Sequence, residues 1–118
     1  MPSGTAPPRT IRKRSDFLLA QAGLKSGSTA FLLTRAIAPN GTGETRLGFT
    51  VTKKVGKAVV RNRIRRRLKE AARKVFPSDC EAGYDYVLIA RPAAETRAFA
   101  LLLDDMKRAL LRLAALPK

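Results

Sequence analysis

Residues 45–76 have the sequence TRLGFTVTKKVGKAVVRNRIRRRLKEAARKVF, and this stretch decides the fold. Apolar residues alternate with polar or small ones over 45–52, which is the two-residue period of a strand with one buried face. Over 57–76 the apolar residues recur three or four apart, as on one side of a helix. They are Val60, Ile64, Leu68, Ala72 and Val75. The stretch therefore predicts a strand followed by a helix, which we expect Pro77 to end.

The sequence on either side of this stretch predicts four more elements. A short helix is expected after Ser15, whose hydroxyl can cap it, and Gly23 is expected to end it. Strands are expected at 29–38 and 84–91, and a closing amphipathic helix at 95–116. A Pro-Asn-Gly turn follows the first of these strands, which predicts a hairpin with the strand that comes next. The order predicts an α/β protein whose helices pack on one sheet.

The length of 118 residues fits a single domain. Residues 1–10 hold three prolines and one glycine, and we expect a flexible leader there, followed by one domain over 11–118. The sequence has neither an apolar run long enough to cross a membrane nor an apolar segment of signal-peptide type at its start. Cys80 is the single cysteine, which fits a reducing compartment. We therefore expect a cytoplasmic protein that does not associate with membranes.

The positive charge is concentrated in one segment. The chain has 24 basic and 9 acidic residues, a formal net charge of +15. Residues 53–74 hold eleven basic residues and one acidic residue, which is two thirds of the net charge. Because this segment also has the helical apolar stripe, we expect it to be folded and to bind a polyanion, with nucleic acid as the leading candidate. The alternative is a solvated basic face with no partner.

The same composition argues against catalysis by the protein itself. The sequence contains no histidine, which removes the commonest general base and the commonest metal ligand. Asp104 and Asp105 are the only adjacent acids, and neighbours on a helix point about 100° apart, so we expect them on a helix surface. We therefore predict no catalytic residue, no metal ligand and no cofactor bound by the protein.

Residues 47–66 resemble the signature of the bacterial ribonuclease P protein component. The likeness lies in Arg-Asn-Arg at 61–63 and in Lys-Lys-Val-Gly-Lys-Ala-Val at 53–59. The strand-like segment 84–91 also matches in order and approximate spacing, and the similarity extends over 11–116. It implies a two-layer α+β sandwich, ribosomal-protein-like, with the order α-β-β-β-α-β-α, one strand more than the sequence pattern places. It also implies a left-handed βαβ crossover, where the general rule favours a right-handed one.

The resemblance also implies a function. Members of the family bind a catalytic RNA and the 5′ leader of precursor tRNA. The complex removes the leader by endonucleolytic cleavage, which gives the mature tRNA 5′ end. The RNA subunit performs the hydrolysis and requires Mg²⁺, and we expect one protein for each RNA.

Two sets of site residues follow from the resemblance and the charge pattern. The expected contacts with the catalytic RNA are Lys53, Lys54, Lys57, Arg61, Asn62, Arg63, Arg65, Arg66, Arg67 and Lys69. The expected lining of the leader-binding cleft is Phe17, Thr34, Arg46, Thr50 and Thr52. Phe17 would stack on the leader, although its alternative interpretation is a core residue. Relatives often carry further aromatic residues where this chain has Gln21 and Thr34, so we expect weaker stacking and more electrostatic leader contacts.

Two other functions fit the sequence. A ribosomal-type RNA-binding protein with only a structural role would have the same size and charge. A DNA-binding protein could place the basic helix in a major groove, but Asn62 is then the only residue on that helix suited to read a base.

Overall fold

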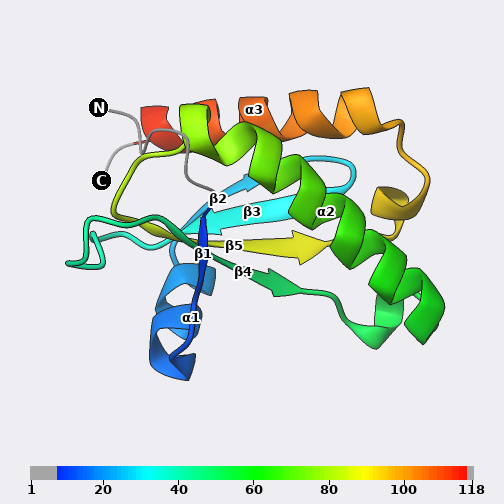
Figure 1. Ribbon diagram of the computed structural model, residues 1–118, viewed down its shortest axis with the longest axis horizontal. Coiled ribbons are helices and arrows are strands. Elements are labelled where there is room, and N and C mark those ends of the chain that lie inside the picture. Colours follow the sequence, from blue (N-terminus) through cyan, green and yellow to red (C-terminus); the bar gives the residue numbers. More distant parts are fainter. Residues whose placement is uncertain (1–7, 117–118) are drawn as a thin grey trace.

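The computed structural model describes residues 8–116 (Figure 1). In chain order the elements of this part are β1 (Arg9–Thr10), α1 (Arg14–Gln21), β2 (Leu24–Gly27), β3 (Phe31–Arg35), β4 (Arg46–Thr50), the 3-10 helix η1 (Lys53–Val55), α2 (Ala58–Asp79), β5 (Asp85–Ala90), the 3-10 helix η2 (Pro92–Glu95) and α3 (Phe99–Ala115). From α1 onward the helices and strands follow the order that the resemblance implies. The α+β fold class is thereby confirmed.

All five strands join one mixed sheet in the order β1-β4-β5-β3-β2. Strand β5 lies at the centre, parallel to β4 and antiparallel to β3. Strand β1 pairs in parallel with β4, and β2 pairs antiparallel with β3. The predicted hairpin between β3 and β4 is therefore wrong, because β5 lies between them. The sequence of β5 is apolar on both faces, which suits the centre of a sheet rather than an edge.

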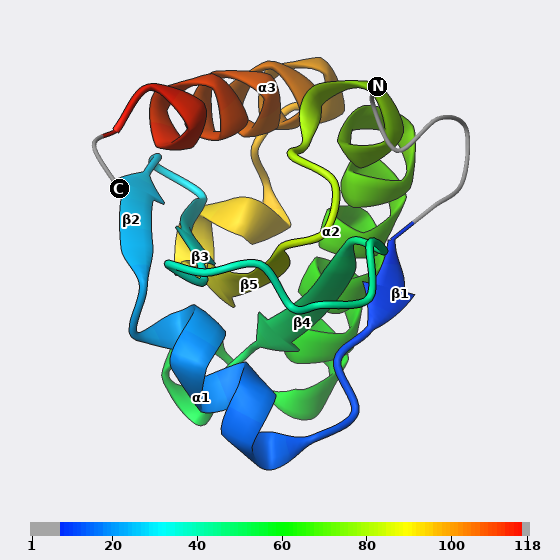
Figure 2. The same cartoon turned by 90° about the vertical axis from the view of Figure 1, so that its left-hand side faces the viewer.

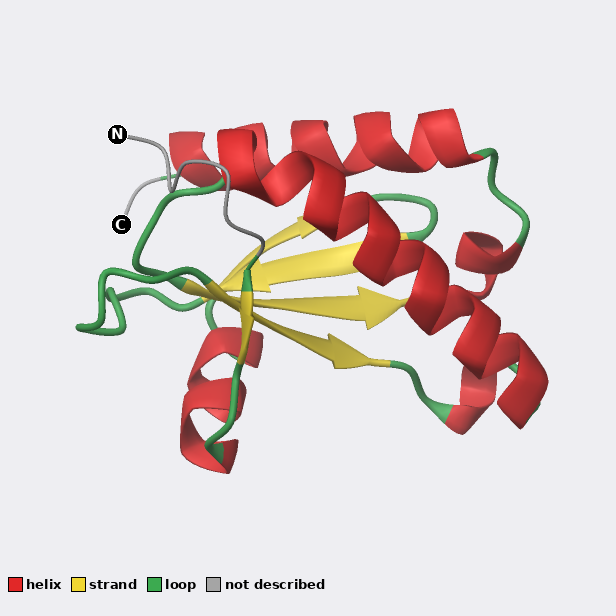
Figure 3. Ribbon diagram, in the orientation of Figure 1, coloured by secondary structure: helices red, strands yellow, loops and turns green. Residues whose placement is uncertain are grey.

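The sheet is covered by α2 and α3 on one face and by α1 on the other (Figures 2 and 3). Side chains along β5 alternate between these two layers: Tyr86 and Leu88 pack with α2 and α3, and Val87 packs with α1. The larger core lies under α2 and α3. There the rings of Phe76 and Tyr86 meet edge to face, with centroids 5.2 Å apart.

The connection from β4 through α2 to β5 is left-handed. In Figure 1 both strands point to the right, β5 lies above β4, and α2 crosses in front of the sheet. With the strands turned to point upward, the chain passes over the front of the sheet toward the left. The expectation taken from the resemblance is confirmed, and the general preference for right-handed crossovers does not hold here.

Two strands lie outside the elements that the sequence pattern predicts. Strand β1 falls within the predicted leader, so that prediction differs from the structure at Arg9 and Thr10, which pair with β4. The earlier part of the leader, 1–7, lies outside the described residues. Strand β2 has the sequence LKSG, which has no β-branched residue. Helix α3 stabilises this strand, because Arg112 donates to Ser26 Oγ and to the Gly27 carbonyl, both at 2.9 Å.

Two helix ends also differ from the prediction. Helix α1 begins at Arg14 with Lys13 as its N-cap, so Ser15 lies inside the helix and does not cap it. Helix α2 continues through Pro77 to Asp79. A proline fixes φ at a helical value, so its cost here is one missing hydrogen bond close to the end of the helix. The next turn still closes, because the Cys80 amide donates to the Phe76 carbonyl at 3.0 Å.

Candidate nucleic-acid interface

Helix α2 presents its charges around a buried apolar stripe. Ile64, Leu68 and Val75 are at most 1% exposed and pack into the larger core. The helix has 22 residues, which corresponds to about 33 Å of length. Because the stripe holds one side of the helix, the basic side chains occupy its two flanks and its outer side.

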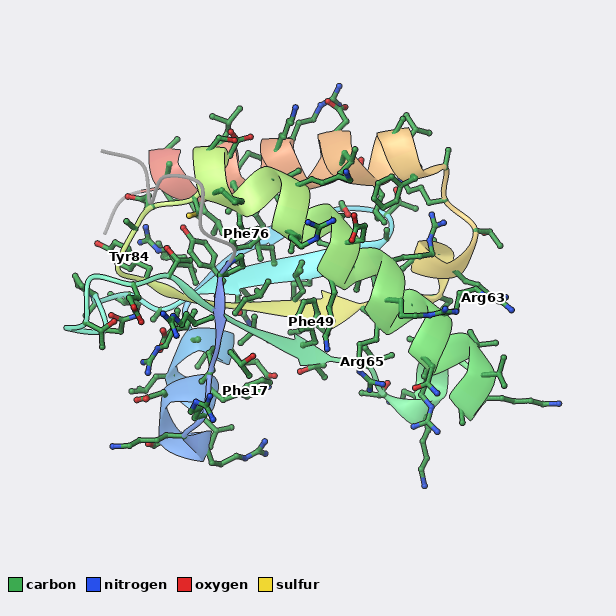
Figure 4. All side chains as sticks on the ribbon, in the orientation of Figure 1. Phe17, Phe49, Arg63, Arg65, Phe76 and Tyr84 are labelled. Atoms are coloured by element: carbon green, nitrogen blue, oxygen red, sulfur yellow. The ribbon has the colours of Figure 1, made fainter. Side chains whose placement is uncertain are left out.

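The structure places five of these basic side chains on two flanks of α2. The first, the β4 flank, consists of Arg61, Arg65 and Lys69, which are spaced four apart. Lys69 Nζ lies 5.9 Å from the centre of the Phe49 ring on β4. Arg65 Nη1 donates to Asn62 Oδ1 at 3.1 Å. Figure 4 shows Arg65 on the side of α2 toward β4 and Arg63 on the opposite side.

The second flank, the η2 flank, consists of Arg63 and Arg67. Arg63 Nη1 lies 2.6 Å from Glu95 Oε2. Arg67 Nε donates to the Ala94 carbonyl at 3.0 Å, and its Nη2 donates to the Arg97 carbonyl. Arg67 therefore binds the segment that leads into α3, which gives it a structural role that the prediction of an RNA contact does not include.

Three exposed lysines lie before α2: Lys53 and Lys54 on η1, and Lys57, the N-cap of α2. Gly56 separates them, with φ at 148°. A Cβ at this position would lie 2.9 Å from Val60 Cγ1, so a side chain would clash as well as strain the backbone. Glycine is therefore what allows η1 to turn directly into α2. The three lysines, Asn62 and Arg66 are exposed near the same end of α2.

The opposite face of the sheet carries α1 and the residues predicted to hold the leader. Phe17 packs against β4 at Gly48, where a Cβ would lie 2.6 Å from Phe17 Cε2. The guanidinium of Arg14 lies 5.8 Å from the centre of the Phe17 ring. Phe17 also packs with a small cluster of buried residues that includes Ile11 and Val87. Phe17 is partly exposed, so its ring belongs to the edge of this cluster and also to the surface.

Arg46 is held by two carboxylates on this face. It donates to both oxygens of Asp85 at 2.7 and 2.8 Å, and to Asp16 Oδ2 at 3.3 Å. Asn40 Nδ2 donates to the same Asp85 at 2.8 Å. The hydrogen bond to Asp85 raises the pKa of Arg46 above its ordinary value, so the guanidinium stays charged. The predicted cleft residue Arg46 is thus positioned by Asp85 and Asp16, which the sequence reasoning missed.

The three threonines of the predicted cleft occupy different environments. Thr34 is fully buried, and its hydroxyl donates to the Val87 carbonyl at 3.4 Å, so it has no surface to offer a ligand. Thr50 is partly exposed, and its hydroxyl donates to Gln21 Oε1 at 3.1 Å. Thr52 is exposed beside η1. The structure therefore leaves Thr50 and Thr52 accessible and brings Gln21 into the same surface.

Comparison with known proteins decides the family. The chain matches the family model described as Ribonuclease P over residues 6–114. The chain belongs to the ribonuclease P protein family. The ribonuclease P protein component of Ruegeria pomeroyi is 49% identical over 107 residues, which cover 89% of this chain and 86% of that protein. The component of Caulobacter vibrioides is 50% identical over 106 residues, covering 89% of this chain and 70% of that protein.

Solved structures of ribonuclease P proteins share the fold. The protein of Thermotoga maritima matches with a TM-score of 0.73 and 28% identity, over 88% of this chain and 96% of that chain. The protein of Staphylococcus aureus matches with a TM-score of 0.70 and 28% identity, over 90% of this chain and 94% of that chain. These likenesses include the mixed sheet and the helices that cover it.

Family membership gives the chain its general role. It is a protein component of ribonuclease P, an endonucleolytic enzyme that processes tRNA, and it associates with the RNA of that enzyme. The basic surface of α2 and η1 is the part of the molecule suited to such a partner. No helix within residues 8–116 has the length and apolar character needed to span a membrane.

Proposed function

We propose that this ribonuclease P component binds the catalytic RNA through η1, the β4 flank and the outer side of α2. The observation that carries this proposal is a set of cations with no carboxylate within ion-pair distance among the described residues. They are Lys53, Lys54, Lys57, Arg61, Arg65, Arg66 and Lys69. Like charges this close repel one another, and RNA phosphates would relieve that repulsion.

Arg61 also supports RNA binding at the β4 flank. Its Nε is buried and has no hydrogen-bond partner among the described residues. The outer nitrogens of this guanidinium can donate to a phosphate oxygen at the β4 flank. Arg63 and Arg67 contribute less directly, since both are already bound to the segment around η2.

The leader of precursor tRNA is proposed to bind the α1 face of the sheet, between Phe17 and the end of β4. The exposed part of the Phe17 ring offers a stacking surface for a single-stranded base. Thr50, Gln21 and Thr52 offer polar groups beside it. Thr34 takes no part in this proposal because it is buried.

The remaining parts of the proposal concern the whole enzyme. Hydrolysis and the binding of Mg²⁺ belong to the RNA subunit, and the protein supplies binding and orientation. One protein is proposed to act with each RNA, in the cytoplasm, where the thiol of Cys80 stays reduced.

Reconstitution tests the proposal. The protein is mixed with bacterial catalytic RNA and a precursor tRNA at low Mg²⁺, and 5′ cleavage is followed. We expect the wild-type protein to raise the cleavage rate, and the double variant Arg61→Ala, Arg65→Ala to lose most of this stimulation through weaker RNA binding. The matched control, Lys107→Ala with Arg108→Ala on α3, removes the same charge and should stimulate cleavage normally.

Three outcomes would contradict the proposal. Equal stimulation by the two double variants would show that the β4 flank does not bind the RNA. RNA binding without any effect on cleavage would favour a purely structural RNA-binding protein. A duplex DNA competitor that displaces the RNA at equal concentration would favour the DNA-binding alternative.

A further inference from the structure

A second pocket lies between β1 and α2, on the sheet face opposite to α1. We refer to it as the β1–α2 pocket, and its volume is about 230 Å³. Its lining consists of Pro8, Arg9, Thr10, Leu47, Phe49, Lys69, Ala72 and Arg73. None of these residues belongs to the proposed leader cleft, and Lys69 alone belongs to the proposed contacts with the catalytic RNA. The pocket is therefore separate from the proposed leader cleft and adjoins the proposed RNA-binding surface at Lys69.

The floor of the β1–α2 pocket is apolar and partly aromatic. Leu47 is 4% exposed, and Ala72 is 1% exposed, so both form a fixed surface. The ring of Phe49 is only partly buried and lies against the same core. An apolar floor with an aromatic ring suits a nucleobase, which binds proteins by stacking and apolar contact. The volume is below that of a typical pocket for a drug-sized ligand, so it fits one nucleotide rather than a larger molecule.

The rim of the pocket carries three cations from two separate elements. Arg9 Nε lies 3.4 Å from Glu44 Oε2, and Arg73 Nη2 lies 2.6 Å from Glu70 Oε2. Both ion pairs are exposed, and such pairs contribute little free energy, so a phosphate can replace either carboxylate. Lys69 has no carboxylate within ion-pair distance among the described residues, and its ammonium lies above the Phe49 ring.

We propose that the β1–α2 pocket binds one nucleotide of RNA. The base lies against Leu47 and Phe49, and the phosphate lies among Arg9, Lys69 and Arg73. The inference rests on the proposed function, since it adds a nucleotide subsite to a protein that binds RNA. Because Arg9 belongs to β1 and the other cations to α2, a nucleotide bound here would also join the start of the domain to the basic helix.

A first experiment tests the pocket without the large RNA. Uridine monophosphate, uridine and inorganic phosphate are titrated separately into isotopically labelled protein, and NMR signals of Leu47, Phe49 and Ala72 are followed. We expect uridine monophosphate to shift these signals at lower concentration than either of the other two compounds. Phe49→Leu keeps the floor apolar but removes the ring, so it should weaken binding of the nucleotide more than binding of phosphate. Equal responses to the nucleotide and to phosphate would overturn the proposal, since no base would then occupy the floor.

A second experiment uses the full catalytic RNA. The slope of log affinity against log salt concentration is measured for the wild-type protein and for Arg9→Gln with Arg73→Gln. Loss of one phosphate contact should reduce the slope by about 1. The control Lys107→Gln with Arg108→Gln removes the same charge from α3 and should leave the slope unchanged.

The outcomes separate this inference from the proposed function. If the Arg9 and Arg73 variant has the same slope as the control, while the wild-type protein binds RNA with a strong salt dependence, the pocket proposal is wrong and the proposed function stands. If the wild-type protein shows no salt-dependent binding, the proposed function fails, and the pocket loses its role in RNA binding with it.

Discussion

Gly48 shows how one missing side chain positions a neighbouring aromatic ring. It lies on β4, on the face that carries α1, and the Phe17 ring occupies the space where its Cβ would be. An alanine at this position would place its Cβ 2.6 Å from Phe17 Cε2. Real contacts are not this short, so the ring would have to move away from the sheet.

Replacing Gly48 with alanine should therefore weaken leader binding and spare binding of the catalytic RNA. Loss of a well-placed stacking contact costs about 1–3 kcal/mol for one base. The measurement is the affinity of the assembled enzyme for precursor tRNA with and without a leader. Gly27→Ala is the matched control, because the nearest atom to its Cβ is 3.6 Å away. A normal leader affinity in the Gly48 variant would show that the position of Phe17 does not matter.

Arg35 is the largest side chain in the fully buried part of the protein. Its guanidinium binds Glu81, lies 4.2 Å from the centre of the Tyr84 ring, and donates through Nε to the Ala36 carbonyl at 3.2 Å. A buried charge is stable only while its partners remain, since water cannot replace them. Glu81 follows the end of α2, so this pair fixes the loop between α2 and β5.

Glu81→Ala should accordingly destabilise the protein by about 3 kcal/mol, the lower end of the range for a broken buried pair, because Glu81 is itself partly exposed. Urea unfolding followed by circular dichroism measures the change. Glu70→Ala removes an exposed carboxylate that pairs with Arg73, and should change stability by less than about 1 kcal/mol. Similar stabilities for the two variants would contradict a structural role for the buried pair.

At the scale of elements, the η2 flank and the exposed outer side of α2 have different tasks. Arg67, on the η2 flank, gives its hydrogen bonds to the segment before α3, whereas Arg66 is exposed. Arg67→Ala should lower stability by about 1.5–3 kcal/mol, the usual worth of hydrogen bonds made by a charged group. Arg66→Ala should leave stability unchanged and weaken RNA binding. Thermal unfolding and RNA titration of both variants test this prediction. A stable Arg67 variant together with a destabilised Arg66 variant would contradict it.

The sequence predicts the long elements well, because their hydrophobic periods are strong. Helix α2 and strand β4 lie where the periods place them, and Ile64 and Leu68 are buried as the stripe requires. Strand β2 escapes the prediction because Arg112, far away in the sequence, supplies part of its stabilisation. The end of α2 escapes it because a proline near the last turn removes only one hydrogen bond.

The sequence shows which segment carries the charge but not the direction in which each side chain points. The run of basic residues lies on α2 and η1. Whether one arginine is free or bound depends on the neighbouring element, and no local pattern shows that Arg67 meets the Ala94 carbonyl. The same applies to Thr34. It is polar, but its side chain is buried on the sheet face that α1 covers.

At the scale of the whole molecule, the positive charge is strongly concentrated in one segment. Segment 53–74 holds eleven of the 24 basic residues, whereas 75–118 holds six basic and six acidic residues. A protein that neutralises about six to ten phosphates should lose about a thousandfold or more in affinity between about 50 and 200 mM salt. Filter binding of the catalytic RNA across this salt range measures the loss. A flat response would mean that binding does not depend on the phosphates.

The central position of β5 has a consequence for how the chain acquires its structure during synthesis. Strands β3 and β4 emerge from the ribosome early, yet neither has its main neighbour until residue 90 has been made. Until then, β3 and β4 each have one unpaired edge. The sheet is completed only when β5 enters between them, so contacts distant in sequence must form late in folding.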